Sequence, residues 1–130
     1  MNEPMNPADA DIPDHFQVVH LDLAHEPDRS DGSADDRYTL LLPLGPDGRI
    51  LEAQARRHPD YCRVSRMRPE GAILRGRMRP GPGPDWRFDF GEAEEAGVRF
   101  AEQRFRPGEY VAVLRDGDPH TYRVIALQPL

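Results

Sequence analysis

Apolar and polar residues alternate with a period of two along most of this chain, which is typical of β-strands with one buried face. In the first such stretch, Val19, Leu21 and Leu23 fall on one face, and His20 and Asp22 fall on the other. Clusters of Pro, Gly and Asp separate the stretches, as tight turns require. The pattern predicts eight strands, at residues 15–23, 37–44, 61–68, 71–79, 86–90, 98–105, 110–115 and 120–128.

Only residues 49–58 carry the composition of a helix, since they are rich in Ala, Leu, Gln and Arg and are followed by Pro59. Short strands at regular spacing are typical of a mainly β fold. We therefore expect one domain over residues 15–130, an antiparallel meander that closes into a small barrel or a sandwich. Residues 1–14 are acidic and interrupted by three prolines, so we expect a disordered acidic tail there.

The hairpin over residues 71–90 allows a register to be predicted. Placing Met78 opposite Trp86 and Gly76 opposite Phe88 makes one face wholly apolar, with an aromatic ring over the bare glycine backbone. The same register gathers arginines on the opposite face. We expect the apolar face to be core and the arginine-bearing face to be exposed.

The hairpin over residues 110–127 has a different pattern, because both of its faces carry apolar side chains. Strands of this kind are usually covered on two sides. The second cover would be the short helix, the interior of a barrel or another subunit. A homodimer formed through this hairpin is therefore one expectation, since two-fold association is common.

Charge is distributed very unevenly along the chain. Residues 1–36 carry ten acidic residues and one arginine, a net charge of −9, whereas residues 37–80 carry ten arginines and four acids, a net charge of +6. All 17 basic residues are arginine. The absence of lysine excludes a P-loop lysine and Schiff-base catalysis.

The arginine-rich middle of the chain provides the main candidate site. Guanidinium groups bind carboxylates and phosphates through paired hydrogen bonds, so we predict an anion-binding face for a polyanion or an acidic protein partner. The candidate residues are Arg66, Arg68, Arg75, Arg77, Arg79 and Arg87. Two patterns disfavour nucleic acid, because the aromatic residues fall on the opposite face and the whole chain is acidic. In the alternative interpretation, acidic loops and the N-terminal segment neutralise these arginines, and that segment acts as a tethered competitor.

Other chemistry has weaker support. His20 and Asp22 would share one strand face and are weak metal-ligand candidates, since a third ligand must come from elsewhere. The carboxylates of residues 91–95 have the pattern of a solvated turn. The single cysteine, Cys62, excludes an internal disulfide, is typical of a reducing compartment, and is expected to be a small buried side chain.

The sequence shows no signal peptide and no apolar run long enough for a membrane span, so we expect a soluble cytoplasmic protein without a membrane partner. The favoured function is a non-enzymatic binding or interaction module without a cofactor, whose ligand the sequence does not identify. Two alternatives remain: an anion- or nucleic-acid-binding protein that uses the arginine-rich face, and a metal-dependent or small-ligand β-barrel enzyme.

Overall fold

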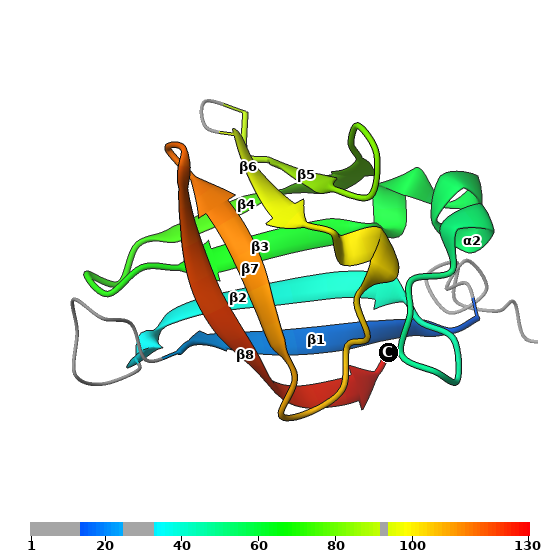
Figure 1. Cartoon of the computed structure of the whole chain (residues 1–130), viewed down its shortest axis with the longest axis horizontal. Coiled ribbons are helices and arrows are strands. Elements are labelled where there is room, and N and C mark those ends of the chain that lie inside the picture. Colours follow the sequence, from blue (N-terminus) through cyan, green and yellow to red (C-terminus); the bar gives the residue numbers. More distant parts are fainter. Residues whose placement is uncertain (1–13, 25–32, 92–93) are drawn as a thin grey trace, which may run out of the picture.

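Eight antiparallel strands form a closed barrel in which each strand pairs with the next and β8 returns to β1 (Figure 1). The computed structural model describes residues 14–24, 33–91 and 94–130. The predicted mainly β fold is confirmed, and the closed barrel is the alternative that is realised. The predicted tail over residues 1–14 lies outside the described residues apart from Asp14. The strands are β1 (Phe16–Leu23), β2 (Ser33–Pro43), β3 (Arg63–Met67), β4 (Ile73–Pro80), β5 (Trp86–Asp89), β6 (Glu94–Val98), β7 (Tyr110–Arg115) and β8 (Asp118–Pro129).

Short helices lie in the connections at one end of the barrel, which we call the helix end. The connection from β2 to β3 holds α2 (Glu52–Arg57) and the 3-10 turn η1 (Pro59–Tyr61), and the connection from β6 to β7 holds η2 (Phe100–Glu102) (Figure 1). The predicted helix over 49–58 is confirmed in place and is shorter than expected. The opposite end carries the β1–β2, β3–β4, β5–β6 and β7–β8 connections, and we call it the hairpin end.

Large side chains fill the barrel interior, because alternate residues of every strand point inward. The fully buried aromatic residues include Tyr38, Trp86, Phe88 and Tyr122, which come from three different parts of the sheet. The Tyr38 and Phe88 rings lie 5.4 Å apart between centroids. The prediction that the first apolar stretch buries Val19 is confirmed, since this side chain is fully buried.

The β4–β5 hairpin has the predicted faces and a different register. Met78 pairs with Phe88 and not with Trp86, so the register is shifted by two residues. The shift arises because β4 continues to Pro80 and a short turn closes when the Gly81 amide donates to the Asp85 carbonyl at 2.8 Å. A two-residue shift leaves every side chain on its predicted face.

The predicted strand over 98–105 is wrong. β6 ends at Val98, Arg99 takes a left-handed conformation with φ of 55°, and η2 follows. The Phe100 ring lies against the backbone of Gly97, where a Cβ atom would come within 2.4 Å of the ring. Phe100 and Phe105 are fully buried, so the apolar pattern of this segment reflects residues that cap the core and not a strand.

The hairpin of β7 and β8 buries only its inner face against the described residues. Val111 and Val113 point into the core, whereas Tyr110 and Leu114 are 60% and 37% exposed. The expected cover on the second face is therefore absent from the described part of the chain. The homodimer through residues 110–127 stays a prediction.

Candidate functional site

Five exposed arginines lie on the outer surface of β3, β4 and β5, and we call this surface the arginine face. Its residues are Arg63, Arg75, Arg77, Arg79 and Arg87. The strand register places two pairs of like charges directly opposite each other, since Arg63 pairs with Arg77 and Arg79 pairs with Arg87. Like charges in such positions destabilise a sheet by up to about 1 kcal/mol per pair. Four of the six predicted anion-binding residues lie on this face.

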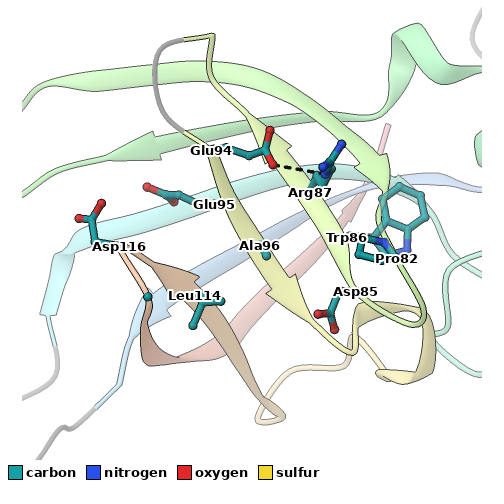
Figure 2. A pocket seen from close by; sticks show the side chains of 10 residues that line it. Pro82, Asp85, Trp86, Arg87, Glu94, Glu95, Ala96, Leu114 and Asp116 are labelled. Atoms are coloured by element: carbon teal, nitrogen blue, oxygen red, sulfur yellow. Dashed lines mark ion pairs between the residues drawn. The ribbon is translucent and has the colours of Figure 1, made fainter.

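Neighbouring carboxylates neutralise the arginine face only in part. Arg77 Nη1 lies 3.2 Å from Asp60, and Arg79 Nη2 lies 3.8 Å from Asp89. Arg87 Nε lies 3.3 Å from Glu94, as Figure 2 shows. All of these side chains are more than one-third exposed. Exposed ion pairs contribute about 0–1 kcal/mol each and exchange readily for other partners. Arg75 forms no ion pair with the residues that the structure describes.

A shallow hollow of about 320 Å³ adjoins the arginine face across β1 to β4. Val18 and Leu41 provide apolar surface, Thr39 provides a hydroxyl group, and Arg63 and Arg75 provide positive charge. We call this feature the β1–β4 hollow; Val64, Ser65 and Gly76 complete its lining. Its combination of apolar and cationic groups suits a ligand that carries both an apolar group and an anion.

A second groove, of about 360 Å³, has the opposite electrostatic character (Figure 2). Its acidic lining residues include Asp85, Glu94 and Asp116. Two of these carboxylates are engaged, because Asp85 accepts a hydrogen bond from the Arg99 amide at 2.7 Å and Glu94 pairs with Arg87. This groove meets the arginine face at Arg87 and adds no further positive charge to it.

The remaining two predicted arginines are placed elsewhere. Arg66 points into the barrel and is 8% exposed, since it shares the inward face of β3 with Val64. The prediction that it belongs to the exposed face is therefore corrected, because the period-two alternation of β3 turns even-numbered residues inward. Arg68 follows the end of β3, where its Nη1 atom lies 3.8 Å from Glu70.

Comparison with known proteins found no matching family model, no matching curated protein and no matching solved structure. Function must therefore be inferred from the residues and their geometry. None of the helices in the described ranges is long and apolar enough to cross a membrane.

Arg66 belongs to a charged cluster inside the hairpin end of the barrel, which we call the interior cluster. Its six members come from five strands: Asp36, Tyr38, Arg66, Glu95, Arg115 and Tyr122. Arg66 donates to both Asp36 carboxylate oxygens at 3.3 Å, and its Nη1 atom lies 3.8 Å from Glu95 Oε2. Two carboxylates and two guanidinium groups give the cluster a net charge of zero.

Two tyrosine hydroxyls complete the interior cluster. Tyr122 donates to Asp36 Oδ1 at 2.8 Å, Tyr38 donates to Glu95, and Arg115 donates to Tyr122. No buried side-chain nitrogen or oxygen in the described ranges lacks a partner. The polar groups of these six side chains bind one another, whereas a catalytic group needs an atom available to a substrate. The cluster therefore suits a structural role, in which it closes the end of the barrel.

The ionisation of the cluster follows from its burial. Burial, with the neighbouring Glu95 carboxylate, raises the pKa of Tyr38 far above its ordinary value. Burial also raises the pKa of Tyr122, although the Arg115 charge acts in the opposite direction. For Arg115, burial lowers the pKa, but hydrogen bonds and charge interactions with the two tyrosines outweigh it and the net shift is upward. The hydroxyls are therefore neutral and the guanidinium groups charged throughout the physiological range.

Sequence reasoning missed the two carboxylates of the interior cluster. The sequence predicts a solvated turn over 91–95, yet Glu95 lies in β6 and is 8% exposed. Asp36 directly precedes the strand predicted at 37–44, yet it lies in β2 and is 3% exposed. A usable signal was present, because Asp36 lies two residues from Tyr38 and Glu95 lies two residues from Gly97, so each shares a face with an inward position.

The weak metal-ligand candidates His20 and Asp22 do lie together on the outer face of β1. His20 Nε2 lies 3.1 Å from Gln128 Oε1, and Asp22 accepts a hydrogen bond from Arg37 Nε at 2.8 Å. No group of three or more potential metal-binding side chains occurs among the described residues. These two positions therefore take part in surface hydrogen bonds, and the metal site stays an untested prediction.

Cys62 is buried at the helix end, as predicted, with 1% of its surface exposed. Its Sγ atom lies 3.9 Å from the carbonyl oxygens of Ala55 and His58. Burial raises the pKa of this thiol to about 11. A thiol in this environment is protonated at neutral pH and is a poor nucleophile.

Proposed function

We propose that this chain is a non-enzymatic binding module that takes an anionic partner on its arginine face. The observation that carries the proposal is the pair of like-charge contacts, Arg63 opposite Arg77 and Arg79 opposite Arg87. Each contact opposes folding in the isolated chain. A bound anion removes that repulsion, because one carboxylate or phosphate placed between two guanidinium groups accepts hydrogen bonds from both.

The partially neutralised state of the face supports the same proposal. Among the residues that the structure describes, three neighbouring carboxylates stand against five arginines, and Arg75 has no ion-pair partner there. The ion pairs that exist are exposed and weak, so an incoming polyanion displaces them at small cost. The local excess of positive charge is then available to the partner although the whole chain carries a net charge of −6.

The chemistry of the face favours an acidic polypeptide over nucleic acid. Single-stranded nucleic acid binding usually needs aromatic rings on which bases stack. Trp86 and Phe88 of β5 point into the core, and the outward positions of β3 to β5 hold no aromatic residue. The net negative charge of the chain also repels a long polyphosphate. Carboxylate groups on a protein partner are bound by individual arginines at close range and so avoid this long-range repulsion.

The proposal includes a cytoplasmic setting without a membrane partner. It is supported by the single cysteine, Cys62, which is buried as a thiol. Proteins of oxidising compartments more often use cysteines in disulfides.

The proposal is tested by salt-dependent retention on immobilised heparin and on immobilised poly-glutamate. The wild-type chain should be retained on both and elute as salt is raised, because the contacts are ionic. A triple variant, Arg75→Gln, Arg77→Gln and Arg87→Gln, should elute without retention. The matched control replaces three exposed arginines outside the face, Arg104→Gln, Arg106→Gln and Arg123→Gln, and should elute as the wild type does.

Equal loss of retention in the two triple variants would overturn the proposal, since net charge alone would then explain binding. Lack of retention of the wild type on either resin would overturn it as well. Stronger retention on heparin than on poly-glutamate at the same charge density would reverse the preference for a protein partner.

A further inference from the structure

The β1–β4 hollow lies close to the point where the described chain begins. We propose that the acidic N-terminal segment, residues 1–13, occupies this hollow and competes with an external anionic partner for the arginine face. This inference rests on the proposed function, because it identifies an internal competitor for the same surface.

The hollow offers two kinds of contact. Val18 of β1 and Leu41 of β2 are partly buried and leave apolar surface at its floor, and they pair directly across the two strands. Arg63 and Arg75 contribute charge from β3 and β4. The ligand that fits is a peptide in which apolar side chains alternate with carboxylates.

The N-terminal segment has this composition. Residues 1–13 contain three acidic side chains and no basic one. Within the same stretch lie larger apolar side chains, at Met5 and Ile12, and Ile12 directly follows Asp11. The neighbouring residues Asp11 and Ile12 supply a carboxylate and an apolar side chain that can act as an anchor in the hollow.

The segment also starts beside the surface that it is proposed to cover. Asp14 is the first described residue, and its carbonyl oxygen accepts a hydrogen bond from Gln54 of α2 at 3.4 Å. Val18, which lines the hollow, follows four residues later, so the two residues are at most about 13 Å apart. A segment of 13 residues has ample length to turn back over this distance.

The residues at which the segment joins the barrel also lie beside the arginine face. Phe16 makes edge-on ring contacts with His58 and Tyr61, with centroids 6.3 and 5.9 Å apart. Asp60, which lies between these two residues in sequence, binds Arg77 of the face. Because the segment is tethered here, its effective concentration at the hollow is of millimolar order, which suffices for occupancy by a weak ligand.

The test compares the full chain with a deletion variant that lacks residues 1–13. A fluorescently labelled synthetic peptide of residues 1–13 should bind the deletion variant and should bind the full chain at least tenfold more weakly, as measured by fluorescence anisotropy. Arg75→Gln in the deletion variant should weaken peptide binding severalfold. Arg123→Gln, an exposed arginine of β8, should leave it unchanged.

Deletion also removes three negative charges, so a charge-conserving variant is needed. Met5→Ser with Ile12→Ser in the full chain keeps the charges and removes the apolar anchors. We expect both this variant and the deletion variant to elute from heparin at higher salt than the wild type. Elution of the serine variant with the wild type, alongside later elution of the deletion variant, would overturn occupancy of the hollow in favour of long-range charge alone.

The remaining outcomes separate the two proposals. If the deletion variant binds heparin and fails to bind the peptide, the inference fails and the proposed function stands. If the deletion variant binds neither probe, the proposed function fails and the inference fails with it.

Discussion

Asp36 and Arg66 face each other inside the barrel in a paired geometry, with Nε and Nη2 of the arginine each 3.3 Å from a different carboxylate oxygen. Asp36 is 4% exposed and Arg66 10% exposed as side chains. Removing one member of a buried ion pair is far more costly than removing an exposed one, because the remaining charge has lost its compensation. The stability of the hairpin end therefore depends on this contact.

The variant Asp36→Asn should lower the free energy of unfolding by about 3 kcal/mol. Asparagine keeps the shape of the side chain and removes its charge, so Arg66 retains only the Glu95 carboxylate and Arg115 loses its carboxylate partner. The measurement is urea unfolding followed by circular dichroism. The control is Asp60→Asn, whose partner Arg77 is exposed, and it should cost less than about 1 kcal/mol. An equal loss of unfolding free energy in the two variants would contradict the conclusion that Asp36→Asn leaves a buried, uncompensated charge.

The interior cluster should also make stability depend on alkaline pH. The phenols of the unfolded chain ionise near their ordinary value of 10.0, whereas burial keeps Tyr38 and Tyr122 neutral well above it. Raising the pH then removes phenolic protons from the unfolded chain only, so the stability that the two phenols provide is complete below pH 10 and falls as the pH rises further. Each tyrosine contributes a loss of about 1.4 kcal/mol per pH unit.

Unfolding measured between pH 9 and pH 12 tests this dependence. Tyr38→Phe should reduce the slope above pH 11 by about half, because one of the two buried phenols has been removed and the Cys62 thiol is ionised in both states there. Tyr110→Phe should leave the slope unchanged, since Tyr110 is 60% exposed. A flat profile for the wild type across this range would show that the buried hydroxyls ionise freely.

The faces of the strands were predictable from the sequence, and the register of the β4–β5 pair was not. Met78 and Trp86 are buried and Arg77 and Arg87 are exposed, as the period-two pattern indicated. A shift by two residues leaves these faces unchanged, so hydrophobic pattern alone does not distinguish the two registers. The turn after Pro80 decides between them, and its length depends on backbone hydrogen bonds that the pattern does not report.

The interior cluster was not predictable for a related reason. A single arginine such as Arg66 is usually exposed, and inward placement is acceptable only when carboxylates from other strands reach it. Those carboxylates, Asp36 and Glu95, lie 30 and 29 residues away in the sequence. Only closure of the barrel brings the three together, and closure was one of two alternatives that the sequence left open.

Gly76 provides a direct test of the close approach between β4 and β5. A Cβ atom at this position would lie 2.2 Å from the Asp89 carbonyl oxygen and 2.9 Å from the Phe90 ring. Because backbone cannot shift as a flexible side chain can, Gly76→Ala should cost about 3 kcal/mol or more. The control is Gly117→Ala, which meets nothing within 4 Å and is strained only by its φ of 83°, at a cost of about 1 kcal/mol. Urea unfolding distinguishes these costs, and a smaller effect at Gly76 than at Gly117 would contradict the observed packing.

Cys62 should report on the opening of the helix end. Burial raises the pKa of its thiol to about 11 from an ordinary 9.0, so at pH 8 about one native thiol in a thousand is ionised, against about one in ten for the unfolded chain. Ionisation alone therefore slows modification by a disulfide reagent about a hundredfold, and the 1% exposure slows it further. The native protein should show almost no reaction with such a reagent over minutes, and the rate should rise with urea in parallel with the unfolded fraction. Rapid stoichiometric modification in the absence of urea would show that α2 and η1 leave the thiol accessible, and Cys62→Ala, which cannot react, sets the background of the assay.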